Sequence, residues 1–434
     1  MKKSYLVSAA LAAILLSGCG EGSSSSDEGT TPAPPPAPAA LQKAYVEFIG
    51  STAEDVAQAS AFDSANNLYV VGYTEGNLTS APNAGKKDMF LRKLDENGST
   101  LCTFQYGTTE DDVALDVAAD SADNIYVTGW TKADFDGHTY SGEDSTLYDG
   151  GDIFIMKFDA DCQKLSSALF GSAGNDNAKA ISIDSNDNVF VAGEVRNGSL
   201  NSQTQQGTKD YFVMKLDTNL NESWTTQFGS SGSDTLNDIV VDNNGSLYIG
   251  GYLDSDISGY VTVQGGDDGY VAKYDAANGN LSWITSITDT DSASYDEVFS
   301  LALTSTQDII AGYHLQNSGV ALVDKNSTLT WQKDLDSFEY FKVAVDSSDN
   351  IYVGSAHYTY DTTIYKLNSS GEEIFHAVFD PIASNGYVAI EDLTYNPNDG
   401  YVYAVGASED DFNAPYTADN NHTGGYDGVV VKFK

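Results

Sequence analysis

The sequence predicts an all-β protein, a seven-bladed β-propeller whose blades are four-stranded antiparallel sheets. Three observations lead to this prediction. A segment typified by Asp120-Ser-Ala-Asp-Asn-Ile-Tyr-Val-Thr-Gly129 recurs seven times, at a mean spacing of about 55 residues. Each repeat holds four short strand-like runs separated by Gly, Asn, Asp and Ser. No apolar period of 3.6 residues occurs after residue 18. Such a repeat of four-stranded sheets is typical of a propeller.

Two further signatures share this period. One is an Asp, an alternating apolar strand with a Lys, and a second Asp, as in Asp152-Ile-Phe-Ile-Met-Lys-Phe-Asp159. The other is Phe170-Gly-Ser-Ala-Gly-Asn-Asp176. In the third unit these signatures place strands at residues 178–184, 188–195, 211–217 and 223–228.

Tight turns join the strands within a unit. The first two strands are joined by an Asp-x-x-Asp-Asn turn, and the last two by a turn such as Asp95-Glu-Asn-Gly98. Asn-Gly supplies the positive φ that a tight hairpin requires.

The phase of the repeats predicts how the ring closes. Residues 43–48 align with the fourth strand of a unit, whereas residues 429–434 align with the third. We therefore expect residues 44–48 to pair with residues 428–433, so that the N-terminal strand completes the last blade. This pairing leaves no unpaired edge between the two ends.

The signatures resemble the bacterial SBBP-type β-propeller repeat, whose units carry Asp-x-x-x-Asn-x-Tyr-Val-x-Gly followed by Asp-x-Phe-Val-x-Lys-Leu-Asp. Units one to four match well, and units five to seven depart from the pattern; residues 307–312, for example, have lost the aromatic residue. The resemblance implies the fold and an exported setting. It implies no reaction, because propellers host unrelated functions.

The N-terminus predicts export and lipidation. Lys2 and Lys3 precede an apolar run over residues 5–16, which is too short to span a bilayer. The following Leu16-Ser-Gly-Cys19 resembles the bacterial lipobox. The resemblance implies removal of residues 1–18 and acylation of Cys19, which would bind the lipid bilayer. The alternative is an ordinary signal peptide with an incidental Cys. Gly20 favours the outer membrane, by analogy with Gram-negative lipoproteins.

The remaining chain divides into a tether and one domain. Residues 19–42 are rich in Ser and Pro and cannot build a core, so we expect an extended linker. Residues 43–434 form the predicted propeller.

The charge limits the partners. The chain carries a net charge of −42, and loss of Lys2 and Lys3 with the leader would make it −44. Nucleic acid is excluded as a partner because its phosphates would be repelled, and anionic lipid headgroups are disfavoured. The acidity suits either solubility in a salty medium or binding of divalent cations.

Two cysteines remain if Cys19 is acylated. Cys102 lies in a fourth strand and Cys162 in a third-to-fourth turn of the next unit. An exported protein can pair them, but the outer strands of adjacent blades diverge, so the pairing stays open. The five His are dispersed and form no metal-type cluster.

The long loops mark one face of the propeller. All long insertions are second-to-third loops, which emerge on the face opposite the short hairpins and are rich in Asp, Gly, Asn and Tyr. We call this the long-loop face and expect an unknown protein or glycan to bind there, because loops commonly carry function. The insertions cover residues 75–87, 131–151, 196–209, 253–267 and 408–426.

Two acids in each regular unit open strands on the long-loop face. Acids at strand starts commonly accept backbone N–H bonds and clasp a turn; the alternative is a Ca²⁺ ligand, although no loop shows a full Asp-x-Asp-x-Asp-Gly spacing. The acids are Asp55, Asp112, Asp176 and Asp234 on first strands, and Asp88, Asp152, Asp210 and Asp268 on third strands.

An aromatic residue follows the second-strand Gly in four units. It can pack between neighbouring blades, or the set can form a partial ring that stacks on sugars or grips a partner's side chains. The four residues are Tyr73, Trp130, Tyr252 and Tyr313.

The predicted function is a non-enzymatic, membrane-tethered binding scaffold in the cell envelope. No Gly-x-Ser-x-Gly lies in a strand-to-helix context. A propeller hydrolase or lyase acting on polysaccharide is one alternative. An outer-membrane assembly factor is another, because Tyr274-Asp-Ala-Ala-Asn-Gly-Asn-Leu-Ser-Trp283 locally resembles a quinoprotein-type propeller repeat, although the period here is longer.

Overall fold

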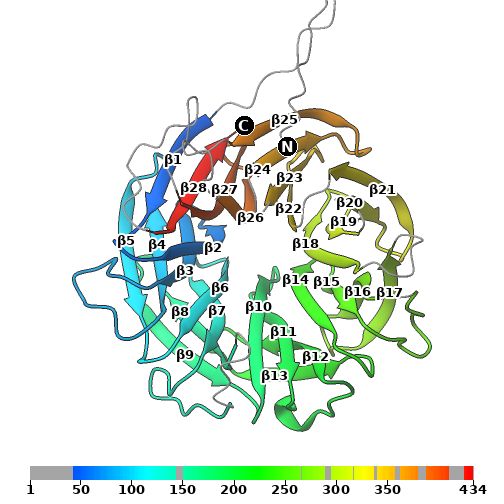
Figure 1. Ribbon diagram of the computed structural model, residues 1–434, viewed down its shortest axis with the longest axis horizontal. Helices are drawn as coiled ribbons and strands as arrows, with labels where there is room; N and C mark the ends of the chain where they lie inside the picture. The colour runs from blue at the N-terminus through cyan, green and yellow to red at the C-terminus, as the bar shows by residue number, and fades with distance from the viewer. Residues whose placement is uncertain are drawn as a thin grey trace, which may run out of the picture. The chain divides into compact units, whose positions relative to one another are not determined.

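The structure is a computed structural model that describes residues 43–142, 150–264, 266–288, 295–315, 317–336, 340–356, 362–379, 388–409 and 425–433. These residues form seven four-stranded antiparallel sheets, which follow one another around a ring (Figure 1). A single 3-10 turn, η1 (Leu200–Ser202), is the helical element in the described part of the chain. The seven-bladed propeller predicted from the repeats is therefore confirmed.

In blades 1 to 6 the strands run in chain order from the inside of the blade outward. Blade 1 contains β2 (Asp55–Phe62), β3 (Leu68–Thr74), β4 (Asp88–Leu94) and β5 (Thr100–Tyr106); blade 2 contains β6 (Asp112–Ala119), β7 (Ile125–Thr131), β8 (Asp152–Phe158) and β9 (Lys164–Phe170); blade 3 contains β10 (Asn175–Ile183), β11 (Val189–Arg196), β12 (Lys209–Leu216) and β13 (Glu222–Phe228); blade 4 contains β14 (Thr235–Val241), β15 (Ser246–Leu253), β16 (Asp268–Asp275) and β17 (Leu281–Ile287). Blade 5 contains β18 (Glu297–Leu303), β19 (Ile309–His314), β20 (Ser318–Val323) and β21 (Leu329–Asp336); blade 6 contains β22 (Tyr340–Val345), β23 (Ile351–Ala356), β24 (Thr362–Leu367) and β25 (Glu373–Phe379).

Blade 7 is built from both ends of the propeller. Its first three strands are β26 (Val388–Asn396), β27 (Tyr401–Ser408) and β28 (Asp427–Phe433), and its outer strand is β1 (Lys43–Ile49). β1 runs antiparallel to β28, from Lys43 opposite Phe433 to Ile49 opposite Gly428.

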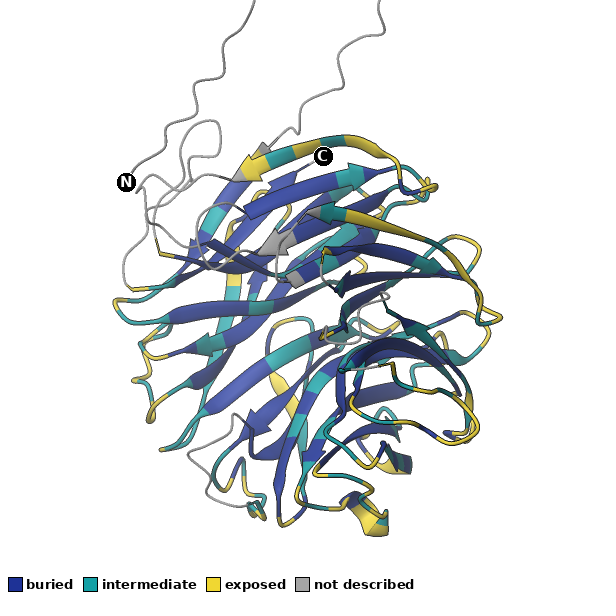
Figure 2. Cartoon of the chain, turned by 45° about the vertical axis from the view of Figure 1, so that its right-hand side comes forward, coloured by how far each residue is buried: buried dark blue, intermediate teal, exposed yellow. Residues whose placement is uncertain are grey.

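The core lies between the blades. Each inner strand packs against the inner strand of the next blade, and the apolar clusters join residues from neighbouring sheets. Buried residues run along the strands, while exposed residues gather at the turns (Figure 2). This distribution follows from strands whose two faces are both covered, so that most strand side chains are apolar.

The Asp-x-x-Asp-Asn turn holds its own hairpin and reaches the next blade. In blade 1, Asp63 Oδ1 accepts the N–H groups of Ala65 and Asn67, at 3.0 and 2.8 Å. Ser64 donates from its N–H and its hydroxyl to Asp123 in the corresponding turn of blade 2, both at 2.7 Å. The signature is therefore a structural motif that links successive hairpin turns.

The Lys of the third-strand signature makes contacts between neighbouring blades. Lys93 lies 3.1 Å from Asp63 and 5.0 Å from the ring centroid of Tyr69, and its Nζ donates to the carbonyl of Ala160 in blade 2 at 2.8 Å. We call this set of Asp, Tyr and Lys the polar latch. It recurs with Lys157, Lys273, Lys366 and Lys432.

The two cysteines form a disulfide, with 6.3 Å between their Cα atoms. Cys102 lies in β5 and Cys162 in the β8–β9 turn, where it takes a positive φ of 59°. The corresponding turn residue of blade 4 is Gly279, which lies against Trp224 of blade 3. The outer strand of one blade is thus covered by a turn of the next, and this contact brings the cysteines within reach.

The predicted leader (residues 1–18), the tether (residues 19–42) and Cys19 lie outside the described residues, as does most of the 408–426 loop. Within the described residues, no helix is long and apolar enough to cross a membrane.

Candidate functional site

The long loops fold back over the outer strands of their own blades. The N–H of Leu78 donates to the side chain of Gln105 at 2.9 Å, and the N–H of Leu200 donates to Gln227 at 3.0 Å. Phe135, from the 131–151 loop, is buried in the core of blades 1 and 2. Much of the described loop chain therefore covers the blades.

The first-strand acids are fully buried clasps. Each accepts the N–H of the residue four positions earlier; for Asp55 the donor is Ser51, at 2.6 Å, and for Asp112 it is Thr108. Burial, opposed by these hydrogen bonds, raises the pKa of Asp112 to about 6. The same contact joins Ser172 to Asp176 and Ser230 to Asp234.

The third-strand acids are clasps as well. The carboxylate of Asp88 accepts the N–H of Ala84 at 3.1 Å and the side-chain amide of Gln105 at 2.9 Å. Asp152, Asp210 and Asp268 accept backbone N–H groups from Ser141, Gln206 and Gln264. In the described ranges no three His, Cys, Asp or Glu side chains gather as metal ligands. Both sets of acids therefore accept backbone N–H groups, as the interpretation of these acids as turn clasps predicts.

The four predicted aromatic residues do not present a ring of free faces. Trp130 and Tyr313 are buried, and Tyr73 and Tyr252 are half-buried. Lys87 Nζ lies 3.9 Å from the ring centroid of Tyr73. Lys132 and Lys209 lie over Trp130 and Tyr252, each at 5.1 Å. Cation–π contacts within the chain therefore occupy three of these rings.

In unit three Glu194 takes the place of the aromatic residue and binds two lysines. Its carboxylate contacts Lys179 Nζ at 2.5 Å and Lys209 Nζ at 3.3 Å. Burial alone would raise the pKa of Glu194, but the two ammonium groups lower it. Lys209 also donates to the hydroxyl of Tyr252 at 3.3 Å. This network joins blades 3 and 4.

The inner strands carry three acids that the sequence interpretation missed. Asp116, Asp238 and Asp392 each follow a β-bulge in the first strand of their blade. Each carboxylate accepts an N–H from the inner strand of the next blade; for Asp116 the donor is Ile181, at 2.7 Å. Burial raises the pKa of Asp238 to about 6. A polar residue that interrupts an apolar inner strand was the signal available in the sequence.

A hollow lies on the face of the short hairpins, where four inner strands end. We call it the cup: β2, β6, β10 and β26 line a volume of about 480 Å³. Its wall includes the hydroxyl groups of Ser60, Ser182 and Thr394 and the apolar side chains of Phe62 and Ile183. Asp392 accepts hydrogen bonds from the Ser60 and Thr394 hydroxyls, both at 3.1 Å, which places this carboxylate directly behind the wall.

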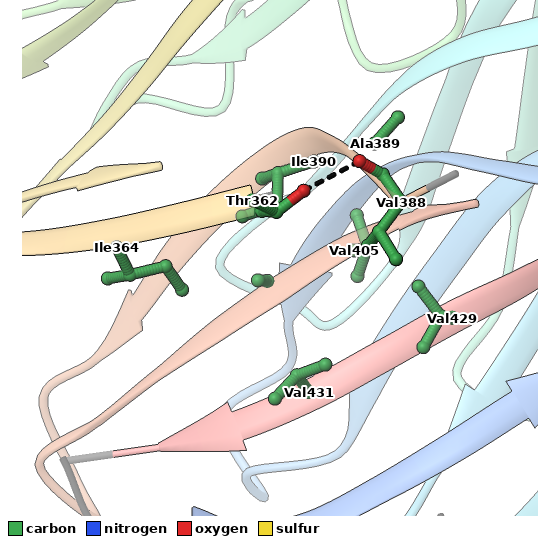
Figure 3. Close-up of a pocket in the computed structure, with 9 residues that line it drawn as sticks. Thr362, Ile364, Val388, Ala389, Ile390, Val405, Val429 and Val431 are labelled. Atoms are coloured by element: carbon green, nitrogen blue, oxygen red, sulfur yellow. Dashed lines mark hydrogen bonds between the residues drawn. The ribbon is translucent and has the colours of Figure 1, made fainter. Parts of the chain in front are cut away.

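A second, apolar cavity lies between blades 6 and 7 (Figure 3). Ile364, Val388 and Val431 are among its lining residues, and the hydroxyl of Thr362 donates to the carbonyl of Val388 at 2.6 Å. This lining offers no free polar group in the described chain, so the cavity is a packing defect of the blade junction.

One Ser, His and Asp set occurs on blade 2. Ser167 donates to Asp136, and its Oγ lies 3.3 Å from His138 Nε2. Lys164 binds the same carboxylate. In an acyl-transfer triad the carboxylate orients the His; here it binds the hydroxyl and a lysine, so the set holds the 131–151 loop on β9.

The seven four-stranded sheets define a seven-bladed propeller. Two segments, residues 104–136 and 223–257, match the SBBP beta-propeller repeat. These two segments confirm the resemblance to SBBP repeats that the signatures predicted.

A curated relative, Regulatory protein FlaEY of Caulobacter vibrioides, is 26% identical over 255 residues. The match covers 56% of this chain and 25% of that protein, so the chain spans about a quarter of the relative's length. Among solved structures, U3-55K is similar with a TM-score of 0.53 and 9% identity, over 90% of this chain and 99% of that one. Raptor of Chaetomium thermophilum has a TM-score of 0.52 and 10% identity, over 89% of this chain and 29% of that one. These structural likenesses show the fold.

Proposed function

We propose that the chain is a non-enzymatic binding scaffold of the bacterial cell envelope, held to a membrane through acylated Cys19. Its ligand is a protein segment or a glycan that enters the cup. The cup is the observation that carries this proposal. The repeated Asp, Tyr and Lys residues are committed to contacts between blades, whereas the cup combines open space with hydroxyl and aromatic groups. The proposal places the ligand opposite the long-loop face.

The envelope setting draws support from two features. The Leu16-Ser-Gly-Cys19 box resembles a lipobox. The Cys102–Cys162 disulfide suits an exported protein, because disulfides persist in oxidising compartments.

A blocked cup tests the binding proposal. Ser182→Trp fills the cup, and Ser223→Trp adds the same side chain on the exposed outer strand β13. Residues 43–434 and both variants are applied to a glycan array and to a peptide-display library. We expect the parent and Ser223→Trp to share ligands and Ser182→Trp to lose them at least tenfold. Ligands that bind all three proteins equally would place the site elsewhere.

The anchor is tested separately. Cys19→Ser should abolish incorporation of labelled palmitate and release the protein from the membrane fraction. Unchanged incorporation and fractionation would contradict the lipid anchor and leave the cup proposal intact.

A further inference from the structure

Two buried acids from neighbouring blades flank the junction of blades 2 and 3. Asp152 begins β8 in blade 2, and Asp176 lies at the start of β10 in blade 3; neither is more than 1% exposed. Their backbones are adjacent, because the N–H of Asp176 donates to the carbonyl of Gly151 at 2.7 Å. A Cβ on Gly171 would lie 2.2 Å from Asp152 Oδ1, and the next residue, Ser172, donates its N–H and its hydroxyl to Asp176.

Asp152 lacks a side-chain amide donor that blades 1 and 3 supply. In blades 1 and 3 the third-strand acids, Asp88 and Asp210, accept the side-chain amides of Gln105 and Gln227, at 2.9 and 3.1 Å. Blade 2 has Leu169 at this register position.

The consequence is an unpartnered oxygen. Asp152 Oδ2 accepts the N–H and the hydroxyl of Ser141, at 2.7 and 2.9 Å. Asp152 Oδ1 has no hydrogen-bond partner among the described residues. A buried acceptor without a donor is costly, and a second buried charge beside it adds to that cost.

We propose that Asp152 and Asp176 share one proton at neutral pH, in a carboxylic acid–carboxylate hydrogen bond across the junction of blades 2 and 3. The proton comes from solvent, supplies the missing donor and leaves one negative charge on the pair. When it returns to solvent at higher pH, two buried charges face each other and the junction loosens.

The electrostatics of the site agree with this arrangement. Burial raises the pKa of Asp176 to about 7, with the neighbouring Asp152 adding to the shift and Ser172 opposing it. Burial also raises the pKa of Asp152, which Ser141 and Gly142 partly offset. Of the cations near this junction, Arg196 lies opposite Asn175 in the β10–β11 register, and Lys132 pairs with Asp111 at 3.9 Å.

The sign of the pH effect follows from the raised pKa. An acid whose folded-state pKa exceeds its ordinary value stabilises the fold below that ordinary value, and this contribution is lost as pH rises through the folded value. The junction is therefore tight at mildly acidic pH and loosens above about pH 7. A single group shifted this far changes the unfolding equilibrium about thirtyfold between roughly pH 5.5 and 8.5.

The matched variants are Leu169→Gln, which restores the amide of blades 1 and 3, and Leu165→Gln, which makes the same change on β9 at a side chain that is 53% exposed. Thermal unfolding of the full chain and these variants is followed from pH 5.5 to 8.5. We expect Leu169→Gln to reduce the pH dependence and Leu165→Gln to leave it unchanged. Asp152→Asn, which removes one charge, should also reduce it and should stabilise the protein at pH 8.5.

Three results would overturn the proposal. One is an equal pH dependence in Leu169→Gln and Leu165→Gln. Another is Asp152→Asn with the pH dependence of the parent. The third is a stabilisation by millimolar Ca²⁺, beyond NaCl at equal ionic strength, that Asp152→Asn removes; this would assign the site to a cation. If Leu169→Gln does not fold, Asp152→Asn decides alone.

Discussion

Blades 2 and 5 form equivalent junctions with the blade that follows, but blade 2 uses charged and polar side chains where blade 5 has mostly apolar ones. In blade 2, Lys157 donates to the carbonyl of Thr218 in the next blade at 2.9 Å. Its Nζ lies 3.9 Å from Asp120 and 4.9 Å from the ring centroid of Tyr126. This is the complete polar latch.

Blade 5 has replaced every member of the latch. Thr304 stands in the place of the Asp, and Ile310 lies opposite Leu322 where the other blades pair an aromatic residue with Lys. Removing one member of a buried polar set leaves the other members without partners and costs stability. Replacing all of them by apolar groups leaves the stability nearly unchanged. In blade 5 the three signature residues have therefore changed together, whereas blade 3 keeps Asp184 and Lys215 and has Phe190 in place of the tyrosine.

Loss of the pairing between β1 and β28 should lower the stability of the protein more than any of the changes that follow. Deletion of residues 43–48 removes β1 from β28, with the buried side chains of Tyr45, Val46 and Phe48. Each ladder hydrogen bond contributes about 0.5–1.5 kcal/mol and each large apolar side chain about 1.5–3 kcal/mol, so the loss approaches the total stability of a domain. We expect a lower melting temperature and aggregation, measured by calorimetry and light scattering. Unfolding like that of the parent would show that the ring does not depend on β1.

The covalent junction of blades 1 and 2 comes next. A disulfide that closes 60 residues should contribute about 2–4 kcal/mol. The double variant Cys102→Ser with Cys162→Gly keeps a residue suited to the positive φ at the turn. Its denaturation midpoint should fall below that of the oxidised parent and match that of the reduced parent. Reaction of both cysteines with a thiol reagent in the untreated protein would contradict the pairing.

The latch comparison can be tested by converting blade 2 into blade 5. Lys157→Met leaves Asp120 buried without its cation, at a cost of about 1.5–3 kcal/mol. The triple change Lys157→Leu, Tyr126→Ile and Asp120→Thr should recover part of that loss in urea unfolding. If the triple variant loses more free energy of unfolding than the three single variants lose in total, replacement as a unit is contradicted.

The smallest effect concerns the cavity between blades 6 and 7. Ala404 lines it, so Ala404→Val should fill part of the space and raise stability by up to about 1 kcal/mol. Ala272, a fully buried alanine on the third strand of blade 4, serves as the control, because Ala272→Val should overpack its site. Equal effects of the two changes on the melting temperature would show that the cavity is not fillable.

The sequence predicted the features that depend on neighbouring residues. Strand positions and turns followed from alternation and from Asn, Asp and Gly at positions of positive φ, as at Asp123. Features that join different repeats were missed or left open. The pairing of Cys102 with Cys162, the role of Lys93 and the inner-strand Asp116 all depend on a partner in another blade.

The site was predicted less well than the fold. The aromatic residues were chosen for their position after a Gly, which gives no information on the lysine over Tyr73. The cup is formed by the ends of four strands that are far apart in the chain, so no local pattern marks it.

The pairing of β1 with β28 determines when the last blade can be completed during synthesis. Lys43 and Phe433 are partners, so the first propeller strand to leave the ribosome is the last to find its neighbour. Until β28 has been translated, β1 carries a row of backbone groups without their ladder partners, beside apolar side chains. A translation product that ends before β28 leaves β1 without its partner strand, where proteases can reach it.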